Sequence, residues 1–172
     1  MSSPSALVPS RWTWPLQLMT ALCSVVFLVG TTLQNFVVVD VTLIETMMAE
    51  AGGVDPAAEA PGFTTGFRIV GCLYMLGNAL GILAFRLRTR WLFWVVLAVN
   101  LTQGLGFVMI PSQMWTAVIE RYGVAGILPS AVTDGGAALL AVLLIVTLVR
   151  YRRTWAQLPV ATETAPDPVA RR

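Results

Sequence analysis

Four long apolar stretches dominate the pattern of hydrophobic and polar residues along the chain. They cover about 14–33, 67–85, 91–110 and 131–149, and their only charged residues are Arg68 and Asp134. An α-helix rises about 1.5 Å per residue, so about 20 apolar residues cross a hydrocarbon core of roughly 30 Å. The pattern therefore predicts an all-α integral membrane protein with four transmembrane helices in a compact bundle.

The two longer connections between these spans contain amphipathic segments. Apolar residues recur at helical spacing over 41–51 and again over 112–122. Both segments predict short helices that lie at the membrane surface or cover the end of the bundle. The Gly- and Pro-rich stretch that follows residue 51 is expected to form a flexible loop.

These elements predict a simple domain organisation. A cytoplasmic N-terminal segment is expected at 1–13, a four-helix transmembrane domain at 14–153 with loops at 34–66 and 111–130, and a disordered cytoplasmic tail at 154–172. The tail contains three prolines and few large apolar residues, a composition that does not support a packed core.

Arginines lie mostly on one side of the four spans. That side has Arg11, Arg86, Arg88, Arg90, Arg150, Arg152 and Arg153, followed in the tail by Arg171 and Arg172, whereas only Arg68 and Arg121 fall on the other. Cytoplasmic loops carry an excess of basic residues, so both termini are expected in the cytoplasm. Tryptophans near the span ends, such as Trp14 and Trp91, fit the aromatic belts of a bilayer.

Composition agrees with a membrane protein and narrows its partners. The chain is 56% hydrophobic and 12% charged, with a mean hydropathy of +0.75 and a net charge of +2. Its few charges form short clusters rather than a basic patch, so no nucleic-acid partner is expected. The expected partners are the lipid bilayer and a second copy or another membrane protein. All eleven basic residues are Arg, which suggests GC-rich coding and a bacterial cytoplasmic membrane.

Polar side chains recur inside the spans at similar depth. Counted along the helices, Ser24, Asn78 and Asn100 lie about 14–17 Å from the outer boundary, and Gln103 lies one turn nearer to it. Amides and hydroxyls at one depth can join helices by hydrogen bonds, or they can line a small polar pocket. The sequence leaves both interpretations open, and these four residues form the candidate polar site.

Arg68 and Asp134 are the ionisable residues within the spans. Each lies near the outer end of its helix, and charge inside a membrane usually pairs or lines an aqueous cavity. They form a candidate ion pair that would close the outer mouth of the bundle. The alternative is that both side chains reach to the interface separately.

The sequence contains no pattern that indicates catalysis or a cofactor. The absence of histidine excludes bis-histidine haem ligation and His-containing zinc or iron sites, and the two cysteines do not form a CxxC pair. No nucleophile–base motif or phosphate-binding glycine loop is present. No cofactor, metal site or catalytic residue is expected, and the sequence identifies no small-molecule ligand.

Three functions remain as hypotheses. The first is a non-enzymatic accessory or binding component of the membrane. The second is an oligomeric transporter or channel for a small solute or lipid, with its polar layer at Asn78, Asn100 and Gln103. It gains some support from a faint repeat of two-span units, in which Arg-Trp opens spans one and three. The third is a membrane enzyme that acts on a lipid through a carboxylate such as Asp134.

Overall fold

Four long helices form the body of the protein. The computed structural model describes residues 7–160. The helices are α1 (Thr13–Leu33), α3 (Pro56–Ile82), α4 (Arg90–Met109) and α7 (Gly136–Tyr151). With their flanking turns, four helical stretches are long and apolar enough to cross a membrane: Thr13–Val38, Pro56–Phe85, Arg90–Met109 and Val124–Tyr151. The predicted helical bundle is confirmed, with one small sheet added.

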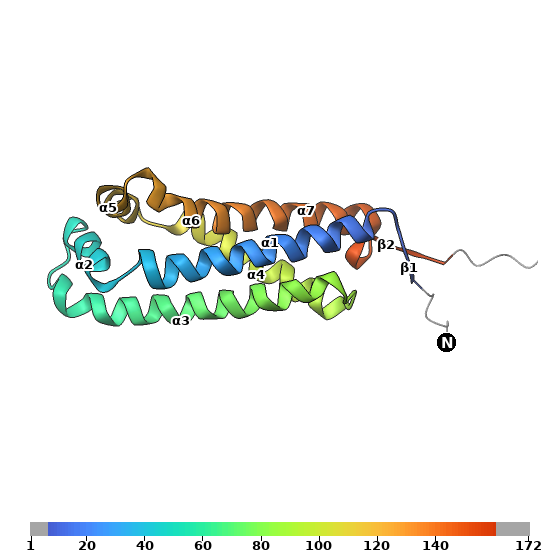
Figure 1. Cartoon of the computed structure of the whole chain (residues 1–172), viewed down its shortest axis with the longest axis horizontal. Helices are drawn as coiled ribbons and strands as arrows, with labels where there is room; N and C mark the ends of the chain where they lie inside the picture. Colours follow the sequence, from blue (N-terminus) through green and yellow to red (C-terminus); the bar gives the residue numbers. More distant parts are fainter. Residues whose placement is uncertain (1–6, 161–172) are drawn as a thin grey trace, which may run out of the picture.

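The long helices lie side by side, and two short helices cover one end (Figure 1). α1 packs against α3 and α7, and α4 packs against the same two helices. The short helices α2 (Val41–Glu50) and α5 (Ser112–Tyr122) form where the amphipathic pattern predicts them, and they contact each other. We call this end the cap end, and we call the opposite end, which holds Arg86, Arg88 and Arg150, the arginine end.

Helix α3 begins earlier than the hydrophobic pattern predicts. Its first residue is Pro56, so the flexible loop expected up to residue 66 is wrong. Asp55 caps the helix by accepting a hydrogen bond from the backbone N–H of Ala58 at 3.3 Å, and proline is favoured in the first turn. The extra turns contain mostly small and polar residues, which is why hydropathy alone does not find them.

The two ends of the described chain meet at the arginine end. β1 (Leu7–Pro9) pairs antiparallel with β2 (Gln157–Pro159). Just before β2, the turn η5 (Thr154–Ala156) buries Trp155 completely, and its indole N–H donates to the carbonyl of Thr89 at 2.9 Å. The prediction of a disordered tail from residue 154 is therefore wrong for 154–160. The rest of that predicted tail lies outside the described residues.

Two apolar clusters form the core, and polar side chains lie between them. The larger cluster includes Leu16 and Phe27 and extends to the arginine end, whereas the smaller one includes Val39 and lies at the cap end. On the path from Phe27 to Val39, the chain carries Thr31, Gln34 and Asn35. This break in the apolar core locates the candidate site.

The outward faces of the long helices are also apolar. The exposed large side chains include Leu22, Leu73, Leu76 and Leu139, with 58–74% of each exposed. Exposed apolar surface on this scale is unusual for a soluble monomer, whereas it is the normal surface of a helix that faces lipid. The fold is therefore compatible with a multi-pass membrane protein.

Candidate functional site

A cavity of about 280 Å³ lies between the two apolar clusters, in the half of the bundle nearer the cap end. We call it the bundle cavity. Its walls come from α1, α3, α4 and the turns that follow α1 and precede α7. Its lining consists of Thr31, Gln34, Asn35, Phe67, Val70, Gly71, Tyr74, Gln103, Gly106, Met109, Ile110 and Asp134.

Two π-helical turns supply half of the polar residues of this lining. η1 (Gln34–Val38) continues α1 and carries Gln34 and Asn35, and η4 (Ala131–Gly135) leads into α7 and carries Asp134. A π-helical turn inserts an extra residue and thereby changes the direction in which side chains point. Such turns are rare and occur frequently at functional sites. Two of them at one cavity are an independent indication that the cavity has a function.

Gln103 joins the polar groups into one network. Its Oε1 accepts a hydrogen bond from Nδ2 of Asn78 at 3.0 Å. Its Nε2 donates to Oγ1 of Thr31 at 3.1 Å and to Oδ1 of Asp134 at 3.3 Å. A single buried amide therefore links α4 to α3, α1 and η4. Because the amide uses its oxygen and both of its N–H groups, it is held in one orientation.

Asp134 and Asn35 are two polar residues of the cavity lining. Oδ1 of Asp134 accepts hydrogen bonds from Gln103 and from Oγ1 of Thr133. Asn35 is 1% exposed; its Nδ2 donates to the carbonyl of Arg68 at 3.2 Å, while its Oδ1 has no partner among the described residues. A Cβ at Gly71 would overlap this amide, so glycine is required for Asn35 to occupy its place. Since a buried acceptor without a partner is costly, Asn35 Oδ1 indicates a missing donor.

We place the opening of the bundle cavity between α3 and α4, where the most exposed residues of its lining lie. Its rim residues on these helices are Val70 and Met109, with 50% and 79% of each exposed. α3 and α4 are joined by a short connection at the arginine end, after Phe85. The opening therefore lies toward the far end of this pair, on an apolar outward face.

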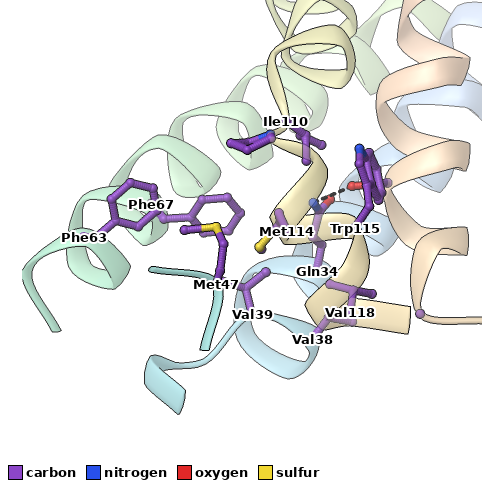
Figure 2. A pocket seen from close by; sticks show the side chains of 13 residues that line it. Gln34, Val38, Val39, Met47, Phe63, Phe67, Ile110, Met114, Trp115 and Val118 are labelled. Atoms are coloured by element: carbon purple, nitrogen blue, oxygen red, sulfur yellow. Dashed lines mark hydrogen bonds between the residues drawn. The ribbon is translucent and has the colours of Figure 1, made fainter. Parts of the chain in front are cut away.

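A second, smaller pocket of about 100 Å³ adjoins the bundle cavity (Figure 2). We call it the cap pocket. It shares Gln34, Phe67 and Ile110 with the bundle cavity and is otherwise mostly apolar. Figure 2 shows Met47 of α2 and Met114 of α5 facing Phe63 and Phe67 of α3 across it, with the amide of Gln34 held by a hydrogen bond to Ser130. The two pockets together offer a polar end and an apolar end.

The structure brings the candidate polar residues together only in part. Asn78 and Gln103 bond directly, but Nδ2 of Asn100 donates to the carbonyl of Val96 on its own helix at 2.8 Å. Ser24 packs against Gly81, where an added Cβ would overlap its hydroxyl. All four side chains are buried, and only Gln103 lines the bundle cavity.

The expected ion pair between Arg68 and Asp134 is not formed. Asp134 bonds to Gln103 and Thr133, while the guanidinium of Arg68 lies 6.0 Å from the ring centroid of Phe36. The salt bridge that the described residues do contain joins Arg121 of α5 to Asp40 before α2. Depth along each helix places Arg68 and Asp134 at a similar level, but it does not say which faces they occupy.

Thr31, Asn35 and Tyr74 line the cavity but are not among the predicted site residues. Their helical spacing with Gln17, Ser24 and Asn78 was the available signal. Gln34 gave no such signal. It reaches the cavity because the π-helical turn η1 shifts the register after Leu33. Neither the hydrophobic pattern nor helical spacing predicts such a turn.

Comparisons with protein families, curated proteins and solved structures found no match to this chain.

Proposed function

We propose that this protein is a non-enzymatic binding component of the bacterial cytoplasmic membrane, and that it takes a small amphipathic molecule from the bilayer. The observation that carries this proposal is the bundle cavity, which holds a polar network inside an otherwise apolar bundle. Small-molecule sites are mostly apolar cavities with a few well-placed polar groups, and they commonly measure about 300–1,000 Å³. The bundle cavity and the cap pocket together fall in this range.

The position of the opening supports entry from the bilayer. Val70 and Met109 lie on apolar outward faces, so a molecule dissolved in the hydrocarbon region reaches the polar end without crossing water. An apolar part of the molecule fits beside Phe67 and extends toward the cap pocket. Its polar part meets Asn35, Thr31 and Asp134 at the inner wall.

Binding is favoured over catalysis and transport by the same contacts. The cavity lining has one carboxyl group and no pairing of a nucleophile with a general base. Asn78 bonds directly to Gln103 and Asn100 bonds to its own helix, so side-chain contacts occupy the polar layer that a transport path would need. This arrangement favours a closed end over a continuous path.

The test fills the cavity without disturbing its polar groups. Gly106 lines the cavity, and a Cβ added there meets no atom within 4 Å. Gly106→Leu should therefore fold and occupy the space. Gly66→Leu is the matched control, because Gly66 is an exposed helical glycine with equally open surroundings that does not line either pocket. Both changes replace a helical glycine, so their effects on helix propensity should be similar.

Binding is measured with 2-phenylethanol, a neutral amphiphile with one aromatic ring. The protein in phosphatidylcholine nanodiscs is titrated by calorimetry, and empty nanodiscs are subtracted to remove partition into lipid. We expect saturable binding to the native protein and to Gly66→Leu, and loss of binding in Gly106→Leu. Equal heats for all three proteins would overturn the proposed site.

The proposal places both termini in the cytoplasm and the cap end outside. Its support is the cluster of arginines at the arginine end and the exposed Trp14, Trp91 and Trp94 near it. A green fluorescent protein fused after residue 172 should fluoresce, because this reporter folds in the cytoplasm. Alkaline phosphatase inserted after Gly52, in the turn between α2 and α3, should be active. The opposite pair of results would reverse the orientation.

A further inference from the structure

The bundle cavity contains a carboxyl group with no basic residue beside it. Asp134 is the one Asp, Glu, Lys, Arg or His residue among the residues that line the cavity. Neither arginine of the cap half forms a salt bridge with Asp134, and Nε of Arg68 has no hydrogen-bond partner among the described residues. Arg121 binds Asp40, and the guanidinium of Arg68 lies over Phe36. A carboxylate inside a membrane is costly unless a positive charge is close to it.

The hydrogen-bond donors and acceptors of the lining differ in how far they are used. The side-chain amide of Gln103 donates two hydrogen bonds to protein oxygens, and those of Gln34 and Asn35 donate one each. The oxygen Oδ1 of Asn35 has no donor among the described residues, and the carboxyl group of Asp134 is a hydrogen-bond acceptor in the same lining. The cavity therefore offers acceptors to a ligand. An ammonium group matches this need, because it has three donors and no acceptor.

Aromatic rings complete the surroundings that a cation prefers. Phe67 and Tyr74 of α3 line the same cavity as Asp134. The face of an aromatic ring attracts a cation, and this attraction grows when water is excluded. The volume of about 280 Å³ suits one aromatic ring with a short chain.

We infer that the bundle cavity selects an amine-bearing amphiphile, whose ammonium group is held by Asp134 and Asn35 and whose apolar part lies against Phe67. This inference rests on the proposed function and adds the charge of the ligand to it. Gln103 acts as a positioning residue, because its amide donates to Oδ1 of Asp134 and restricts the orientation of the carboxyl group.

The experiment compares two probes of nearly the same shape in the nanodiscs described above. Phenethylamine carries an ammonium group where 2-phenylethanol carries a hydroxyl. We expect the native protein to bind the amine at least about tenfold more tightly, which corresponds to about 1.4 kcal/mol. Asp134→Asn should remove this preference and leave the affinity for the alcohol nearly unchanged. Asparagine retains an oxygen for Gln103 and Thr133, so the variant keeps the existing hydrogen bonds.

Two further variants keep the test decisive. Glu120→Gln removes an exposed carboxylate of α5 that does not line the cavity, and it should retain the preference for the amine. If Asp134→Asn does not fold, Gln34→Glu adds a second carboxylate to the cavity and should strengthen amine binding further.

Each outcome separates the inference from the proposed function. Equal binding of amine and alcohol, both lost in Gly106→Leu, would overturn the inference and keep the cavity as a site for neutral amphiphiles. A preference for the amine that survives Asp134→Asn would also overturn it. Absence of binding by either probe to the native protein would contradict the proposed function for ligands of this size.

Discussion

Arg121 forms a two-pronged ion pair with Asp40, although the two residues are far apart in the sequence. Nη1 and Nη2 of Arg121 donate to Oδ1 and Oδ2 of Asp40 at 2.7 and 2.6 Å. Oδ1 of Asp40 also accepts the backbone N–H of Leu43 at 2.8 Å, so this carboxylate caps α2. One side chain thus starts a short helix and ties it to α5, and these two helices form the wall of the cap pocket.

Acid should loosen the contact between α2 and α5. The hydrogen bonds from Arg121 lower the pKa of Asp40 below its usual value, and the N–H of Leu43 adds to this effect. The resulting stabilisation is complete above the unfolded pKa of about 4 and is lost as pH falls through the lower folded value. Since both side chains are more than one-third exposed, the loss should be below about 1 kcal/mol. Thermal unfolding in detergent, measured at low and neutral pH, would detect it.

Substitutions separate the ion pair from the helix cap. Asp40→Ser keeps an oxygen for the N–H of Leu43 but removes the charge, so it should resemble Arg121→Gln. Asp40→Ala removes both functions and should cost about 1 kcal/mol more. High salt should lower the free energy of unfolding of the native protein toward that of Arg121→Gln, and it should leave the free energy of unfolding of Asp40→Ala unchanged. Equal stability of all three variants would mean that the cap contributes nothing.

Gly104 should tolerate substitution far less than Gly106, although the two lie on the same helix. A Cβ at Gly104 would lie 2.8 Å from both Cα and N of Ala138, and backbone atoms cannot move aside. Gly104→Ala should therefore push α4 and α7 apart and cost about 1–3 kcal/mol. Gly106→Ala meets open space and should be neutral or slightly stabilising, because alanine favours the helix. Equilibrium unfolding in mixed micelles compares the two, and equal losses would contradict the close contact.

The hydrophobic pattern predicts where the helices lie in the sequence better than it predicts which face of each helix turns toward its neighbours. Four apolar runs with few charges leave little choice but long helices, and the amphipathic spacing locates α2 and α5 closely. Depth along a helix follows from counting, so the pattern places Asn78 and Gln103 near the same level, and they do bond. The rotation of each helix depends on packing. For this reason Asn100 turned out to bond to its own helix, and Arg68 does not meet Asp134.

Local distortions of the helices explain why the sequence does not predict the cavity. η1 and η4 each change the helical register at the residues that matter, and Gln34 and Asp134 reach the cavity through them. The ordered segment at 154–160 is missed for a related reason. Three prolines and several charges make the region as a whole resemble a tail, whereas one buried tryptophan anchors its beginning.

Asn78 and Asn100 should differ in their contributions to stability, although both are buried amides at similar depth. Asn78→Leu removes the donor to Gln103 across helices and should cost about 0.6–2 kcal/mol. Asn100→Leu removes only a bond within α4, so it should be nearly neutral. The side-chain oxygens of both asparagines lack a partner among the described residues, so the difference comes from the bond between helices. Reversible unfolding in micelles measures both. A large loss for Asn100→Leu alone would show that Asn100, not Asn78, holds the helices together.

Trp155 should be the most sensitive position near the C-terminal end of the described chain. Its ring is fully buried, makes an edge contact with Phe93 at 5.3 Å between centroids, and donates to the carbonyl of Thr89. Trp155→Ala should cost about 3–5 kcal/mol, because it leaves a large cavity and an unpaired carbonyl. Trp91→Ala is the control, since Trp91 is half-exposed on α4 and its substitution should cost much less.

Truncation tests the same anchor in a second way. A chain that ends after Val160 should melt like the native protein, whereas one that ends after Arg153 should melt like Trp155→Ala. If both truncated chains melt like the native protein, Trp155 does not anchor this end of the bundle.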